Sequence, residues 1–100
     1  MWAELKREAA VETVKLRGRG RGACIGNVTT SIGAALTMLG LNIRDRAALR
    51  ELRLALASDV FGRKIESYND LTDTELSVLS RRVGQPGALL DIKNWYKHNQ

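Results

Sequence analysis

The sequence predicts a single all-α domain, a small bundle of four to five helices over residues 1–100. Two observations support this prediction. Apolar residues make up 44% of the 100-residue chain, which is enough for one hydrophobic core but not for two. These residues also recur at the three- and four-residue spacing of amphipathic helices, and no stretch alternates in the manner of a strand.

The first predicted helix spans residues 2–17, which are rich in Ala, Glu, Lys and Leu. The repeated Arg-Gly pairs at residues 17–22 follow, and their glycines predict a flexible basic loop. Residues 23–28 are interpreted as a short extended piece that leads into the next helix.

The second predicted helix begins near Thr29 or Thr30, either of which suits the N-cap, and ends at Gly40. Gly33 lies inside it, where we expect a glycine to permit the close approach of a neighbouring helix. One face of this helix is apolar and consists of Ile32, Ala35, Leu36 and Leu39.

The third predicted helix spans residues 43–61, with Asn42 and Asp45 as a capping pair and Gly62 as its end. Two stripes run side by side along it. The apolar stripe consists of Leu49, Leu52, Leu56 and Val60, and the basic stripe of Arg46, Arg50 and Arg53.

A polar connector at residues 63–70 separates this helix from the strongest local signal in the chain. Thr72 and Glu75 have the spacing of a capping box, and Leu71 and Leu76 that of a hydrophobic staple. These residues predict a helix that ends at Gly84. A last helix is expected from Pro86, a residue that suits the first helical position, and Trp95 is expected to dock it onto the core.

The formal charge of +5 at pH 7 is unevenly distributed along the chain. Residues 1–22, 44–64 and 81–100 each have a net charge of +3, and residues 65–80 have a net charge of −4. The acids near residue 73 begin a helix, where its dipole favours them, so capping explains them without a metal site. The basic blocks therefore form the charge that is left to bind a polyanion.

Six arginines are the candidate nucleic-acid-binding residues, in a basic loop and on the helical stripe. The Arg-Gly loop resembles a truncated AT-hook without its prolines. We expect contacts to phosphates more than to bases, with duplex DNA as the partner. The alternative for the basic loop is a solvated connection between helices, and the alternative for the stripe is a solvated helix edge. The candidates are Arg17, Arg19, Arg21, Arg46, Arg50 and Arg53.

The composition argues against an enzyme, a metal site and a bound cofactor, because the chain has one His, His98, and one Cys, Cys24. A single Cys predicts a buried thiol in a reducing, cytoplasmic setting. The first residues contain three glutamates and no apolar run, so we expect no signal peptide. The uncharged residues 23–43 are interpreted as a core helix and not as a membrane span, because glycines and polar residues dilute them.

About half of the chain, from Leu36 to Val83, contains a series of motifs in a fixed order. They are Met38-Leu39-Gly40-Leu41, the Leu/Arg-rich helix, Gly62-Arg63-Lys64, Ser67 and Asp70-Leu71-Thr72-Asp73-Thr74-Glu75-Leu76. This order resembles that of the phage Mu GemA-like regulatory proteins. The chain departs from that pattern where Ala48 and Leu49, and no aromatic residue, precede Arg50. The resemblance implies a small phage regulator that acts on host transcription and DNA topology, with no catalytic residues to transfer.

A second function stays open on the sequence alone. The chain is also compatible with a protein-binding inhibitor or adaptor that acts on a host enzyme complex, or with a self-associating helical module that forms an oligomer. In that interpretation the apolar face that contains Ile32 and Leu36 contacts a partner helix.

Overall fold

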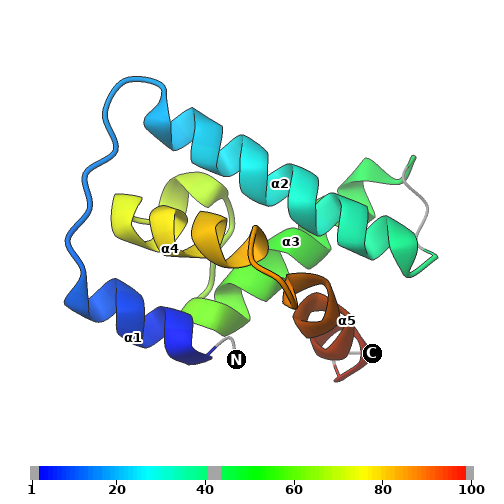
Figure 1. Ribbon diagram of the computed structural model, residues 1–100. Helices are drawn as coiled ribbons and strands as arrows, with labels where there is room; N and C mark the ends of the chain where they lie inside the picture. Colours follow the sequence, from blue (N-terminus) through cyan, green and yellow to red (C-terminus); the bar gives the residue numbers. More distant parts are fainter. Residues whose placement is uncertain (1–2, 41–43, 99–100) are drawn as a thin grey trace.

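The computed structural model describes residues 3–40 and 44–98 and confirms the all-α prediction. Within these residues the chain forms five α-helices and one 3₁₀ turn, with no strand (Figure 1). The elements are α1 (Ala3–Val11), α2 (Gly20–Met38), α3 (Arg46–Phe61), the 3₁₀ turn η1 (Tyr68–Asp70), α4 (Asp73–Val83) and α5 (Ala88–His98).

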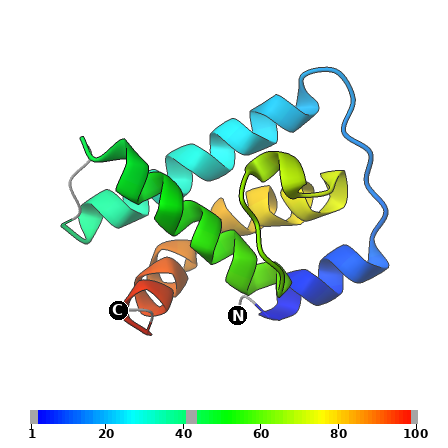
Figure 2. The ribbon, with the colours of Figure 1, turned by 180° about the vertical axis from the view of Figure 1, so that it is seen from behind.

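Helix α4 lies at the centre of the bundle and packs against α1, α2 and α5. Helix α2 crosses α4 on one side and α1 lies on the other, as Figure 1 shows. Helix α3 lies on the face turned toward the viewer in Figure 2 and packs against α1 and α2. Every helix therefore contributes to one shared core.

The predicted apolar stripes form that core. Leu36, Leu56, Leu76 and Leu79 are completely buried, and Ile32 and Ile92 are 1% exposed. Complete burial of a side chain of this size stabilises the fold by about 1.5–3 kcal/mol. Only Leu52 and Leu39 of the predicted stripes are half-buried, at the edge of the core.

The first helix is shorter than the predicted 2–17, because α1 ends at Val11. Residues 12–17 run in an irregular stretch along the start of α4. The backbone N–H of Val14 donates to Thr74 Oγ1 at 3.0 Å, and that of Leu16 donates to Asp73 Oδ2 at 3.1 Å. These partners replace the hydrogen bonds of another helical turn, so the tertiary contacts override the local helix propensity.

The second helix is longer than predicted, because α2 already begins at Gly20. The predicted loop over residues 17–22 and the extended piece at 23–28 are therefore wrong in their secondary structure from Gly20 on. Arg19, and neither Thr29 nor Thr30, occupies the N-cap position. The chain turns before the helix at Gly18, whose φ of +59° lies in the left-handed region that favours glycine.

Gly33 lies inside α2, as predicted, but no neighbour approaches it. A Cβ atom placed on Gly33 would have no atom within 4 Å beyond its own helix backbone. The expected close helix contact is wrong, and Gly33 faces open space beside α3.

The ends of the remaining helices follow capping chemistry. Asp45 caps α3 and accepts a hydrogen bond from the Ala48 N–H at 3.1 Å, so α3 begins at Arg46 and not at residue 43. Asn42, its predicted partner, lies outside the described residues. Gly62 ends α3 in the left-handed conformation, with a φ of +68°, as its position predicts.

The capping box of α4 is confirmed, with Thr72 and Glu75 bonded reciprocally and both leucines of the staple buried. The predicted start of the last helix at Pro86 is wrong. Gly87 has a φ of +89°, which no helix contains, so α5 begins at Ala88. Trp95 docks α5 as predicted, packing against the core while its Nε1 donates to Asp59 Oδ2 at 2.7 Å.

Candidate nucleic-acid interface

The six candidate arginines occupy two regions of the fold. Arg17 and Arg19 lie in the stretch that leads into α2, at the left of Figure 1. Both side chains are exposed. Neither makes a hydrogen bond or an ion pair with any residue in the part of the chain that the structure describes.

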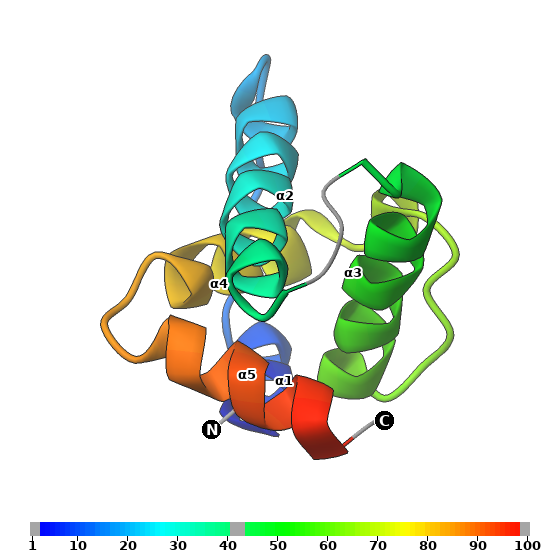
Figure 3. The same cartoon turned by 90° about the vertical axis from the view of Figure 1, so that its right-hand side faces the viewer.

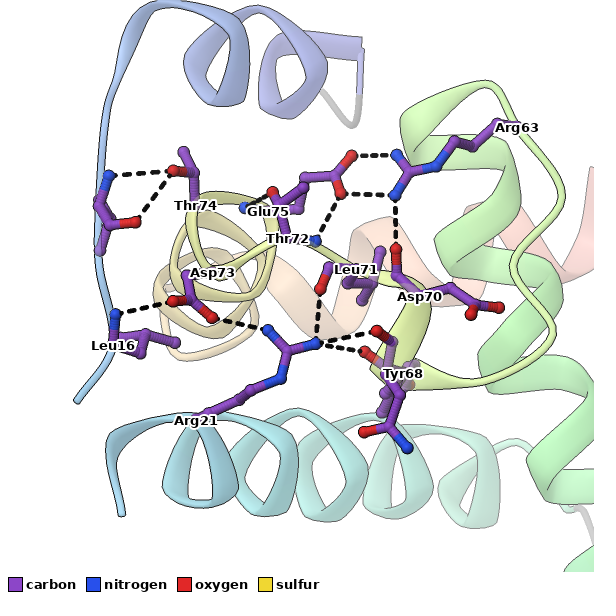
Figure 4. Close-up of polar contacts among 12 residues, drawn as sticks. Leu16, Arg21, Arg63, Tyr68, Asp70, Leu71, Thr72, Asp73, Thr74 and Glu75 are labelled. Carbon is purple, nitrogen blue, oxygen red and sulfur yellow. Dashed lines mark hydrogen bonds and ion pairs between the residues drawn. The ribbon is translucent and has the colours of Figure 1, made fainter. Parts of the chain in front are cut away.

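Arg21, the third arginine of the Arg-Gly repeat, has a different environment. Its Nη1 donates to Asp73 Oδ1 at 2.7 Å, and its Nη2 donates to the carbonyl oxygen of Leu71 at 2.5 Å. The same Nη2 lies 3.2 Å from the carbonyl oxygens of Tyr68 and Asn69 (Figure 4). Arg21 therefore joins the first turn of α2 to the start of α4 and is not available for a phosphate.

The sequence pattern did not distinguish Arg21 from Arg17 and Arg19, because its partners lie about fifty residues further along the chain. The partner of Arg21, Asp73, is 52 residues away. Capping explains why the first turn of α4 is acidic. The two carboxylate oxygens of Asp73 also accept hydrogen bonds from elsewhere in the chain, one from Arg21 and the other from the Leu16 N–H. Only the packing of α2 on α4 brings the two together.

A second arginine, Arg63, also binds at the start of α4, and the sequence did not predict this role for it. Arg63 donates from Nη2 to Glu75 Oε1 at 2.7 Å and to the Asp70 carbonyl oxygen at 2.8 Å, and its Nη1 binds the other Glu75 oxygen (Figure 4). Burial alone raises the pKa of Glu75, but the hydrogen bonds from Arg63 and from the Thr72 N–H outweigh it and lower that pKa. The hydrogen bond to Glu75 in turn raises the pKa of Arg63.

The pKa of Asp73 is also lowered, first by the hydrogen bond from the Leu16 N–H and then by Arg21. Both acids at the start of α4 are therefore held ionised by partners within the protein. Among the described residues, no group of three His, Cys, Asp or Glu side chains is placed to hold a metal ion.

The basic stripe of α3 is present as predicted. Arg46 and Arg50 are exposed, and Arg53 is half-buried. Arg50 Nη2 donates to the Glu66 carbonyl oxygen at 3.2 Å, whereas Arg46 and Arg53 make no such bond within residues 3–40 and 44–98. Burial raises the pKa of Tyr68 to about 12, and the charge of Arg53 opposes that rise, so the two side chains are neighbours.

The two basic regions lie on either side of the connector, which in the structure extends to Leu71. Arg21 binds carbonyl oxygens of this connector from α2, and Arg50 binds another from α3. Arg46 is the first residue of α3, whereas Arg17 and Arg19 precede α2. The candidate residues thus extend along the molecule and do not converge on one point.

The C-terminal basic block is separate from these regions. Arg81 pairs with Glu12, and Arg82 pairs with Asp91. Helix α5 lies at the opposite end of the molecule from the stretch that leads into α2 (Figures 1 and 2). Three basic blocks in the sequence therefore correspond to two candidate regions in the fold.

The rival interface, the apolar face of α2, is already used inside the fold. Ile32, Ala35 and Leu36 are between 0% and 4% exposed. They pack in the protein's own core, so the prediction that they contact a partner helix is wrong. No described helix is long and apolar enough to span a membrane.

Cys24 is half-buried on α2 and packs against the core as a free thiol. The expectation of a buried thiol is therefore met only in part.

Comparison with known proteins gives no relative. No protein-family model, no curated protein and no solved structure matches this chain.

Proposed function

We propose that this protein binds nucleic acid through its phosphates, using Arg17, Arg19, Arg46, Arg50 and Arg53. The proposal rests on one observation: most of these guanidinium groups are exposed and have no partner among the described residues. Arg21, which the sequence grouped with them, is withdrawn because its donors are committed to Asp73 and the connector.

The contacts that the acidic residues make within the fold support this proposal. Residues 65–80 contain four acids, and each has a partner close by. Glu66 pairs with Lys64, Asp70 accepts from the Glu66 and Ser67 N–H groups, and Asp73 and Glu75 bind Arg21 and Arg63. The acidic block is therefore neutralised mainly within the fold, and it does not offset the positive potential of the unpaired arginines.

Exposed guanidinium groups suit phosphate because they donate in a planar fork that matches two oxygens. They lie before or at the start of α2 and along α3, so they can contact phosphates at more than one place on a duplex. Contacts of this kind position a protein on nucleic acid without reading the sequence. We therefore expect affinity that depends little on sequence and strongly on salt.

The test is fluorescence anisotropy with labelled duplex DNA of random sequence over a series of salt concentrations. Each phosphate contact contributes about −0.9 to the slope of log affinity against log salt. The pair Arg17→Ala and Arg19→Ala should make that slope shallower by about 1.8 units. The pair Arg46→Ala and Arg53→Ala should have an effect of the same size.

The matched control is the pair Lys93→Ala and Lys97→Ala, two exposed cations of α5, which removes the same charge from a helix that carries none of the proposed contact residues. It should leave the slope as in the wild type. An equal decrease in the salt slope in all three double variants would show that net charge alone attracts the DNA, and would refute the assignment of these arginines. No measurable affinity at low salt, with the circular dichroism spectrum unchanged, would refute the proposal.

We propose further that this protein is a regulator of the phage type, as the resemblance to the GemA-like proteins implies. Single-stranded DNA and RNA of equal length are tested beside the duplex, and we expect the duplex to bind most tightly because its charge density is highest. Light scattering on the same samples measures the oligomeric state. A stable oligomer that ignores all three nucleic acids would favour a protein-binding adaptor instead.

A further inference from the structure

A groove runs between α2 and α3, which Figure 3 shows beside each other. It has two ends of different chemistry. Thr29 of α2 and Arg53 of α3 line both ends, so the ends are continuous.

One end of the groove is basic and polar, with a volume of about 240 Å³. Its polar side chains all can donate hydrogen bonds, and no carboxylate is among its lining residues. The polar lining consists of Thr29, Arg50, Arg53, Ser67, Tyr68 and Asn69. Two guanidinium groups without a lining acid give this end a preference for an anion.

Tyr68 adds an independent observation at this end. Its side chain is 8% exposed, and its hydroxyl group is buried without a hydrogen-bond partner in the part of the chain that the structure describes. Buried hydroxyl groups in folded proteins are almost always paired. Tyr68 lines the same end as Arg50 and Arg53, so its hydroxyl group is a polar atom of a lining residue that the described residues leave unpaired.

The other end is apolar, with a volume of about 520 Å³. Leu49, Ala34 and the bare backbone at Gly33 line it, together with the side chains of Thr30 and Thr37. Thr37 Oγ1 donates to the Gly33 carbonyl oxygen at 2.8 Å, so this hydroxyl group is already satisfied within α2. The lining contains no aromatic ring to stack on a base, and its only charged residue is Arg53, where the two ends meet.

We propose that this groove binds a single-chain anionic amphiphile, a molecule with one aliphatic chain and a carboxylate or phosphate head. The head group lies between Arg50 and Arg53, and the chain lies along Gly33, Ala34 and Leu49. An aliphatic lining next to a pair of cations matches both parts of such a molecule.

The test uses isothermal titration calorimetry of the whole chain with dodecanoate and with dodecyl phosphate, each below its micelle concentration. Dodecyl maltoside has the same chain with a neutral head, and we expect it to bind at least tenfold more weakly. Octanoate and decanoate complete a series in which each buried methylene increases affinity by up to about fourfold. Comparable affinity for dodecanoate and dodecyl phosphate would show that the site accepts either anionic head group. Tighter binding of one compound would show which head group, carboxylate or phosphate, the natural ligand carries.

Two leucine substitutions at glycines of α2 distinguish an effect on the groove from a general effect of a larger side chain on this helix. A side chain at Gly33 or at Gly26 would have no neighbouring atom near its Cβ, so both variants should fold. Gly33→Leu fills the apolar end and should weaken dodecanoate binding at least tenfold. Gly26→Leu, outside the groove, should leave it unchanged.

The head-group site is tested with Arg50→Gln and Arg53→Gln together, which should reduce dodecanoate binding to the level of dodecyl maltoside. Amide NMR shifts in the wild type provide a readout that needs no variant, and they should cluster at Gly33, Leu49 and Arg53. Equal binding of the neutral amphiphile, an unaffected Gly33→Leu variant, or binding only to phosphatidylglycerol vesicles and not to monomers would each overturn the proposal.

Discussion

Arg19 and Arg21 have the same side chain and are separated by one glycine, yet they make different contacts. Arg19 is exposed at the N-cap position of α2. Arg21 donates to Asp73 and to three carbonyl oxygens of the connector before α4. A position two residues further into the helix therefore changes a surface cation into a structural residue.

We expect Arg21→Ala to lower the free energy of unfolding by about 2 kcal/mol, because it leaves the Leu71 carbonyl oxygen and one Asp73 oxygen without the donor that Arg21 supplies. Arg19→Ala should change it by less than about 0.5 kcal/mol, as is usual for an exposed site. Urea denaturation followed by circular dichroism measures both. Equal stability of the two variants would contradict the structural role of Arg21.

At the scale of elements, the start of α4 organises the fold. Its capping box satisfies the backbone N–H groups of Thr72 and Glu75. The same few residues accept bonds from residues 14 and 16, from α2 and from Arg63, the second residue after α3. Because partners from three other parts of the chain converge here, the helix start is both a local signal and the meeting point of the bundle.

We expect Thr72→Ala to destabilise the protein by about 1 kcal/mol, the usual cost of losing an N-cap side chain. Thr72→Ser keeps the acceptor oxygen and should restore most of the stability. Thr30→Ala, at an exposed position of α2, is the control and should change the melting temperature little. A Thr72→Ala variant as stable as the control would show that tertiary contacts alone hold this helix end.

At the scale of the whole molecule, ion pairs join distant parts of the chain. Arg21 meets Asp73 and Arg81 meets Glu12 across more than fifty residues of sequence. The first pair and the Arg63–Glu75 pair depend on ionised acids whose pKa values are lowered in the folded state. Stability should therefore depend on pH in the acidic range.

The sign follows from the direction of these two shifts. An acid with a lowered folded-state pKa contributes its full stability above its ordinary value, about 4 for Asp and Glu. That contribution is lost as the pH falls through the folded-state pKa. We therefore expect the free energy of unfolding to decrease from pH 5 toward pH 2, measured by urea titrations at each pH.

The pair Asp73→Asn and Glu75→Gln should flatten that pH dependence and lower the stability at pH 7. The control pair is Glu8→Gln and Glu51→Gln, two exposed acids that make no bond to another described residue. It should keep the pH dependence of the wild type. If the first pair retained the full decrease, other groups would be responsible for it.

By itself the sequence determined the all-α class, the apolar stripes of α3 and α4, the ends at Gly40, Gly62 and Gly84 and the capping box at Thr72. These features depend on residues a few positions apart, so spacing and backbone preference suffice to predict them. Only the tertiary structure decided where α1 stops and α2 starts. It also removed Arg21 from the candidate surface and placed a groove beside Gly33 and Arg53. In each case the deciding partner lies on another helix, and the free energy of that contact exceeds the local preference of the segment.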